Sequence, residues 1–353
     1  MQPDPRFWSG RRVCVTGGTG FLGIHLVMLL QSVGAAVRVF ALPPAVAHPL
    51  MGMGAIEAVW GDLLDSASVR RAVAGCDVVF HTAGTVAVWG PALARLQDVH
   101  VLGTRHVVDA AGGARVVHTS SIVAVGASRR EEVFTESDAF PFARLRVPYV
   151  RAKRAAEELV LGAAAAGQDV VVVNPGYLLG PEDYEPSAMG RFCIRAWKGR
   201  VILSAPGGYN FVDVRDVAAG HLLAAERGER GRRYILGGEN LRMPEFLRRL
   251  AAVARLRPRA IPVLPVAGLW LAAAIAEGRA KYLTGREPYP AFQHVRVNRY
   301  DWFCSSERAE RELDYRARPL DETLRDTHRW FAERGRVALR GFGRWWMRPS
   351  VAA

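Results

Sequence analysis

The apolar residues of this chain gather in short, β-branched runs, and segments with helical spacing separate most of these runs. The runs predict strands at 12–16, 36–41, 56–60, 77–81, 115–119 and 169–174. The intervening segments predict helices, most clearly at 24–32, 66–74, 92–111 and 149–166. Because strands that alternate with helices form parallel sheets, the pattern predicts an α/β fold with a doubly wound parallel sheet.

The pattern changes after Asn174, where Pro, Gly and Tyr residues interrupt the apolar runs. Residues 176–210 predict loops around one helix, and 211–236 predict a return to the sheet that ends in a short strand. The segment 237–333 then predicts mainly helices. We therefore expect three parts, which are a sheet domain at 11–175 completed by 211–236, a smaller, discontinuous, mainly helical substrate lobe at 176–210 and 237–333, and a tail at 334–353.

The longest apolar run, 261–276, lies in the second of these parts. It contains two prolines and is too short to cross a bilayer as a helix. A run of this kind is more often a buried helix, and contact with a membrane surface is the alternative.

Three glycines follow the first predicted strand at intervals of three residues. Gly17, Gly20 and Gly23 stand between that strand and the helix that comes next. Here they provide a tight turn, a close approach of the backbone to a pyrophosphate, and close packing of helix on sheet. The helix N-terminus adds backbone N–H groups and a positive dipole end. The motif therefore predicts a dinucleotide-binding domain of the Rossmann type.

Small or polar residues end the later strands, at the edge where open α/β sheets bind ligands. Asp62 follows the third strand and can accept a hydrogen bond from an adenine amino group, whereas Asp65 is better placed to cap the next helix. Ala83 and Gly84 follow the fourth strand and allow contact of a cofactor with the backbone, although a plain turn also explains Gly84. Ser121 follows the fifth strand.

Tyr149 and Lys153 form a Tyr-x-x-x-Lys pair at the start of a predicted helix. The chain has only three lysines among its 47 Lys and Arg residues, so a lysine between Arg151 and Arg154 indicates a position that Arg cannot fill. At i and i+4 the two side chains share one helix face. An ammonium near a phenol favours the phenolate, which lowers the phenol's pKa and makes it a usable acid or base. An ordinary exposed helix start is the alternative.

These motifs, in this order, resemble the extended short-chain dehydrogenase/reductase superfamily over about residues 11–333. The resemblance implies that Ser121 orients a substrate oxygen, that Tyr149 transfers a proton, and that Lys153 holds the ribose hydroxyls and lowers the Tyr149 pKa. It implies hydride transfer to or from a nicotinamide, with no metal. The residues it implies for cofactor binding are Gly17, Thr19, Gly20, Phe21, Leu22, Gly23, Asp62, Leu63, Ala83, Gly84, Lys153 and Pro175.

A narrower likeness comes from later motifs, which include Val173-Asn174-Pro175, the segment 210–221 and Gly237-Gly238-Glu239-Asn240-Leu241. They resemble the hopanoid-associated sugar epimerase or oxidoreductase group, which is related to dihydroflavonol reductases and 3β-hydroxysteroid dehydrogenases. This likeness implies lineage more than substrate.

Two positions depart from the superfamily's pattern near the cofactor. At the end of the second strand, where an acidic residue favours NAD and an Arg favours NADP, the chain has Ala41 and Leu42. The cofactor is therefore NAD or NADP, with NADP(H) slightly favoured because no carboxylate repels its phosphate. His100 replaces an Asn common in these families, and we expect a hydrogen-bonded helix histidine rather than a proton relay.

A third departure bears on the substrate. Nucleotide-sugar epimerases of this superfamily carry an Arg that pairs with diphosphate at the position that Tyr209 or Asn210 occupies here. We therefore expect an alcohol or ketone on an apolar or glycosylated isoprenoid skeleton, with Tyr177 and Tyr209 as candidate substrate-binding residues. The alternatives are a sugar epimerase or dehydratase that uses tightly bound NAD, and a non-catalytic dinucleotide-binding sensor or scaffold.

The composition adds few constraints. The net charge is +13, but no basic-aromatic motif accompanies it, so we expect no nucleic-acid partner. The four cysteines are far apart and the N-terminus lacks an apolar signal region, which favours the cytoplasm. The tail carries Arg at intervals of four with Trp345 and Trp346, so peripheral membrane contact and a disordered cationic tail are both open. A homodimer is also left open.

Overall fold

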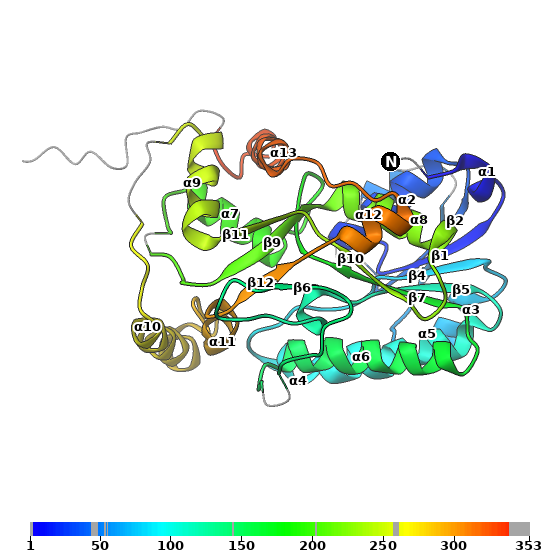
Figure 1. The fold of residues 1–353 in the computed structure, drawn as a ribbon, viewed down its shortest axis with the longest axis horizontal. Coiled ribbons are helices and arrows are strands. Elements are labelled where there is room, and N and C mark those ends of the chain that lie inside the picture. The colour runs from blue at the N-terminus through cyan, green and yellow to red at the C-terminus, as the bar shows by residue number, and fades with distance from the viewer. Residues whose placement is uncertain are drawn as a thin grey trace, which may run out of the picture.

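The computed structural model describes residues 3–43, 49–52, 54, 56–142, 145–201, 203–256 and 261–338. Most of the predicted cationic tail, from 339 onward, lies outside the described residues. Figure 1 shows a sheet with helices on both of its faces, and a second group of strands and helices that contains β9, β11, α9 and α10.

The larger sheet has seven parallel strands in the order β10-β7-β5-β4-β1-β2-β3. Its strands are β1 (Arg12–Thr16), β2 (Ala36–Ala41), β3 (Ile56–Trp60), β4 (Val78–His81), β5 (Arg115–Thr119), β7 (Val170–Pro175) and β10 (Arg233–Leu236). The six strands predicted first from the apolar runs agree with this sheet to within one residue at each end, and β10 takes in the short strand expected at its far edge. The doubly wound α/β fold is therefore confirmed.

Helices cover both faces of this sheet, which explains why its strands are nearly continuous apolar runs. One face packs on α2 (Phe21–Ser32) and α8 (Val214–Arg227), and the other on α3 (Ser66–Val73), α5 (Gly103–Ala111) and α6 (Pro148–Ala165). Val171 and Val173 of β7 point to the first group, whereas Val170 and Val172 point to the second. Both faces are fully buried along β7, because the side chains alternate.

A second sheet has five short strands in the order β11-β9-β12-β6, with β8 also paired to β9. They are β6 (Val133–Phe134), β8 (Tyr177–Leu179), β9 (Gly208–Asp213), β11 (Glu239–Arg242) and β12 (Asp301–Cys304). The helices near them are α7 (Ala188–Trp197), α9 (Met243–Val253), α10 (Val266–Arg279), α11 (Phe292–Asn298) and α13 (Leu320–Glu333). Five of the remaining elements are short, and these are α1 (Pro5–Trp8), η1 (Pro49–Gly52), η3 (Ile122–Ala124), η4 (Ala280–Thr284) and α12 (Glu307–Leu313). The sequence pattern did not predict this sheet, since such short strands carry little periodicity.

Two helical predictions differ from the structure. The segment 92–111 is divided into α4 (Pro91–Ala94), a π-helical turn η2 (Asp98–Leu102) and α5, rather than being one helix. The apolar run 261–276 enters α10 at Val266, yet only Ala273 of that helix is buried. The expectation of a buried helix was therefore wrong. Within the described residues, no helix combines the length and apolar character needed to cross a membrane.

Candidate active site

The residues selected from the sequence converge at the carboxyl edge of the larger sheet. Thr16, His81, Thr119 and Pro175 are the last residues of β1, β4, β5 and β7, which are neighbours in the sheet. Since the strands are parallel, these ends share one edge, where open α/β sheets bind ligands.

The glycine turn lies between β1 and α2. Gly17 has a φ of +71°, which favours glycine, and a Cβ atom on it would lie 2.7 Å from the Ala83 Cα. A Cβ atom on Gly23 would lie 2.1 Å from the Gly17 carbonyl oxygen, so only glycine allows the helix to start this close to the strand. Gly20 is the N-cap of α2 and no side chain caps the helix. The backbone N–H groups of its first turn, at Phe21, Leu22 and Gly23, are thus available to an anion beside Thr19. This arrangement fits a dinucleotide pyrophosphate.

The segment after β4 is closely packed. A Cβ atom on Gly84 would lie 2.7 Å from the His100 ring, so the backbone and the imidazole are in contact. His100 is buried, and its Nε2 lies 2.8 Å from the Thr85 carbonyl oxygen. Burial lowers the pKa of His100 to about 3, with the Lys153 charge as a second cause. His100 is therefore a neutral, hydrogen-bonded helix histidine, as expected.

Asp62 and Asp65 have separate roles after β3. Asp65 is the N-cap of α3 and accepts from the Ala67 N–H, which confirms the capping expectation. The Asp62 carboxylate accepts from the Leu64 N–H and lies 3.6 Å from an Arg95 nitrogen, with nearly half of its side chain exposed. An exposed carboxylate at this sheet edge is accessible to an adenine group. Leu63 is buried against α5, where a Cβ atom on Gly103 would meet its side chain.

Ser121, Tyr149 and Lys153 lie together at the ends of β5 and α6. The Ser121 side chain is hydrogen bonded to the Tyr149 phenol. Lys153 is buried one helical turn below Tyr149, and its Nζ donates to the Thr119 carbonyl oxygen at 2.9 Å. The structure thus brings together the three side chains that the resemblance implied.

The pKa of the Tyr149 phenol differs in direction from the sequence-based expectation. Burial raises it to about 12, and the hydrogen bond from Ser121 offsets this only partly. Burial also lowers the pKa of Lys153 to about 8, while the Glu157 charge opposes that change. In this structure the Lys153 ammonium donates to the Thr119 carbonyl oxygen. Desolvation of the Tyr149 phenolate outweighs any attraction between the phenolate and this ammonium.

A buried polar group beneath Lys153 was missed by the sequence reasoning. Glu157 is fully buried and pairs with Arg233 at 3.0 Å, and it also accepts from the Asn174 amide at 2.6 Å. The Asn174 amide also donates to the Ser121 carbonyl oxygen at 3.1 Å. Glu157 is therefore linked, through Asn174, to the backbone of Ser121. Its spacing of four from Lys153 on one helix could have revealed it.

Four histidines are buried close to the same edge, namely His81, His100, His118 and His221. His81 lies within hydrogen-bond distance of Thr16 and Thr104, and the Nε2 of His221 lies 2.9 Å from the Thr119 hydroxyl. The His118 ring has no hydrogen-bond partner in the part of the chain that the structure describes. Burial lowers the pKa of all four, so they are neutral at neutral pH.

The two candidate substrate residues are in contact with each other. The rings of Tyr177 and Tyr209 have centroids 4.3 Å apart. Tyr177 is half-buried, whereas Tyr209 is only 4% exposed and its phenol donates to Asn298. Asn210 is fully buried and bonds to Asn240 at 2.8 Å, so its amide is engaged within the protein. Neither Tyr209 nor Asn210 offers the cationic fork of an arginine.

The end of β2 carries Ala41 and Leu42, which are 8% and 62% exposed.

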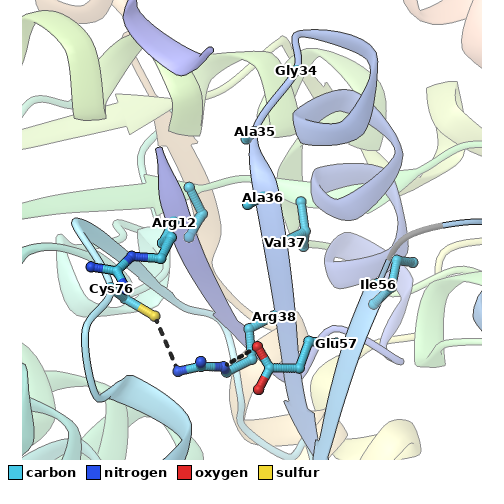
Figure 2. A pocket seen from close by; sticks show the side chains of 10 residues that line it. Arg12, Gly34, Ala35, Ala36, Val37, Arg38, Ile56, Glu57 and Cys76 are labelled. Carbon is cyan, nitrogen blue, oxygen red and sulfur yellow. Dashed lines mark hydrogen bonds and ion pairs between the residues drawn. The ribbon is translucent and has the colours of Figure 1, made fainter. Parts of the chain in front are cut away.

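Cys76 and Arg38 line a cavity of about 590 Å³ near the starts of β1, β2 and β3, where Arg38 reaches Cys76 and Glu57 (Figure 2). This cavity is at the amino edge, opposite the candidate catalytic residues. Among the described residues, no cluster of His, Cys, Asp and Glu is suited to hold a metal ion.

The fold and the site define a dinucleotide-binding α/β protein with a Ser, a Tyr and a Lys at the carboxyl edge of its sheet. The model of the NAD dependent epimerase/dehydratase family matches residues 13–237. The chain belongs to this family, as the motifs indicated.

Similar proteins include reductases and dehydrogenases. A protein of Synechocystis sp. with a provisional dihydroflavonol 4-reductase name is 35% identical over 94% of this chain and 98% of its own length. Sterol demethylase protein B of Methylococcus capsulatus is 35% identical over 92% of this chain and 99% of its own length. The solved structure of gox2253 is 30% identical, covers 93% of this chain and 100% of its own, and has a TM-score of 0.80.

Proposed function

We propose that the protein is an NAD(P)-dependent oxidoreductase that interconverts an alcohol and a ketone on a large apolar substrate of sterol, hopanoid or flavonol type. The observation that carries the proposal is the convergence of Ser121, Tyr149 and Lys153. The names of two relatives support a large apolar substrate. One is named as a sterol demethylase protein, and the other, from Stigmatella aurantiaca, is named as a ketoreductase of a farnesyl-bearing quinoline.

A nicotinamide cofactor, when bound at this edge, would supply or accept the hydride. In the reducing direction, Tyr149 is protonated at neutral pH and donates its proton to the substrate oxygen, since its pKa is raised to about 12. Because the Ser121 hydroxyl is bonded to the same phenol, both hydroxyls can contact one substrate oxygen. The cation of Lys153, one turn away, stabilises the phenolate that remains and is suited to hold the ribose hydroxyls.

The second lobe supplies the substrate wall in this proposal. Tyr177 contacts Tyr209, and Tyr209 and Asn210 occupy the position where a diphosphate clamp would need an arginine. An apolar skeleton fits such a wall better than a nucleotide sugar, whose phosphates need a charged partner.

We favour NADP(H) as the cofactor, since Ala41 and Leu42 place no carboxylate at the end of β2. Replacing Ala41 by Asp introduces a charge there that would repel a 2′-phosphate and accept from a 2′-hydroxyl. We expect Ala41→Asp to raise the Kd for NADPH relative to the Kd for NADH by at least about tenfold. An unchanged ratio would contradict this placement of the cofactor. We also place the protein in the cytoplasm, where its four cysteines stay reduced.

The experiment that tests the function offers the protein steroid, hopanoid and nucleotide-sugar substrates, each with both cofactors. We expect net oxidation or reduction of the cofactor with an apolar alcohol or ketone. Epimerisation or dehydration of a sugar without net redox change would instead establish an epimerase or dehydratase.

A further inference from the structure

The large apolar side chains that the structure leaves exposed are concentrated in one segment of the second lobe. Of the twelve such residues in the described part of the chain, six lie within 263–289, and these are Val263, Leu271, Ile275, Tyr282, Leu283 and Tyr289. Leu271 and Ile275 are 64% and 57% exposed, and they lie at i and i+4 on one face of α10. The helix continues directly into η4, where Tyr282 and Leu283 are 75% and 78% exposed. We name these four residues the α10–η4 surface.

One side of α10 is held by the protein and its other side is uncovered. The Trp270 ring lies 5.4 Å from that of Phe292 in α11, and Glu277 accepts from the Phe292 N–H at 2.7 Å. Only Ala273 of the helix is buried. In Figure 1, α10 and α11 lie at the opposite end of the molecule from α1. The α10–η4 surface is therefore an apolar face that the described part of the chain leaves exposed.

The charges around this surface are mainly positive. The segment 263–289 contains Arg279, Lys281 and Arg286, all exposed, against two acidic residues. The Glu277 carboxylate is engaged by α11, as described above, and the Lys281 ammonium lies 5.1 Å from the Tyr282 ring centre. Aliphatic and aromatic side chains interleaved with cations match the interface of a bilayer with anionic headgroups.

A second copy of the chain is a poorer match. In a two-fold dimer the same patch meets itself, so the cations of each copy would face those of the other. Anionic lipid headgroups neutralise the same cations, while the acyl region takes up the apolar side chains.

We propose that the α10–η4 surface docks onto the surface of an anionic lipid bilayer. Docking does not depend on the reaction proposed above, so failure of one leaves the other intact. It also differs from membrane contact through the tail, whose residues from 339 onward lie outside the described residues.

The test is sedimentation of the full chain with vesicles of phosphatidylcholine, with and without phosphatidylglycerol. We expect binding to the anionic vesicles, and a fall in the partition coefficient of at least about tenfold in the variant Leu271→Gln/Ile275→Gln/Leu283→Gln. The control is Val133→Gln on β6, which removes an apolar side chain of 51% exposure from another element and should leave binding unchanged. Since the replaced side chains are exposed, all these variants should melt at the wild-type temperature.

A second set of variants tests the cations. Arg279→Gln, Lys281→Gln and Arg286→Gln should each weaken binding to anionic vesicles by about fivefold and have little effect on pure phosphatidylcholine. Three outcomes would overturn the proposal. In the first, the wild-type chain does not bind vesicles. In the second, binding persists in the apolar variant and disappears in Trp345→Ser/Trp346→Ser. In the third, the apolar variant changes from dimer to monomer while its vesicle binding is unchanged.

Discussion

The ammonium of Lys153 donates a hydrogen bond to the backbone carbonyl oxygen of Thr119, with 2.9 Å between Nζ and O. This bond joins α6 to the carboxyl end of β5 and holds the lysine beside Ser121 and Tyr149. Burial lowers the pKa of this ammonium to about 8, and the carboxylate of Glu157 opposes the shift. The charge state of Lys153 is therefore set by the residues packed around it.

The first prediction concerns the proton donor. Replacing Tyr149 by Phe removes the hydroxyl that is bonded to Ser121 while keeping the ring. We expect kcat to fall about a hundredfold to ten-thousandfold, with dinucleotide affinity almost unchanged. Steady-state kinetics and calorimetric titration measure the two effects. Tyr234→Phe is the matched control, because the Tyr234 phenol accepts from the Glu229 N–H within the protein, away from the site. Equal turnover in Tyr149→Phe and the wild type would remove Tyr149 from the mechanism.

The second prediction concerns pH. As pH rises through about 8, Lys153 loses its proton and with it the cation that stabilises the phenolate, so the rate of reduction should fall. In Glu157→Gln the carboxylate that raises the Lys153 pKa is gone, and the alkaline limb should move to lower pH by about one unit.

Glu158→Gln is the control for this shift. Glu158 is exposed, pairs with Arg154 and lies one residue further along α6. Its variant should keep the wild-type profile. A merely structural role of Glu157 would lower stability, because Arg233 loses its partner, without moving the alkaline limb. An unmoved limb in a folded Glu157→Gln protein would therefore exclude the electrostatic role.

The third prediction concerns the glycine turn. A Cβ atom in Gly23→Ala would lie 2.1 Å from the Gly17 carbonyl oxygen, so the turn and the start of α2 must move. We expect loss of dinucleotide binding, measured by calorimetry, and a lower melting temperature. Gly162→Ala is the matched control, since it lies in α6 with no atom within 4 Å of its Cβ position. It should stabilise the protein by roughly 0.5–1 kcal/mol and bind dinucleotide normally. Normal binding by Gly23→Ala would show that the cofactor lies elsewhere.

The fourth prediction concerns acid stability. Burial lowers the pKa of His221 to about 4, whereas an unfolded histidine titrates near about 6.5. Between these values only the unfolded chain binds the proton, so stability falls as pH falls. In His221→Gln the slope of the free energy of unfolding against pH should be smaller near pH 5 by about 1.4 kcal/mol per pH unit. Chemical denaturation over a series of pH values measures it. The two slopes should coincide above about pH 7, and equal slopes near pH 5 would mean that His221 is charged in the folded protein.

The larger sheet could be predicted almost completely from the sequence. The runs 12–16, 36–41 and 115–119 coincide with β1, β2 and β5, because strands with helices on both faces are apolar over most of their length. The second sheet could not be predicted. Its strand β6 has two residues, and such strands are formed by pairing with distant segments rather than by local preference.

The sequence by itself determined the glycine turn and the positions of Ser121, Tyr149 and Lys153, since chain order and helical spacing are local properties. Tertiary structure alone decided the charge states of these groups, because desolvation depends on what packs around a side chain. It therefore paired the buried Glu157 with Arg233, and raised the Tyr149 pKa where spacing had suggested the opposite. It also decided that α10 lies at the surface. An apolar run indicates only that a helix favours an environment without water, whereas the fold determines whether other residues cover that helix.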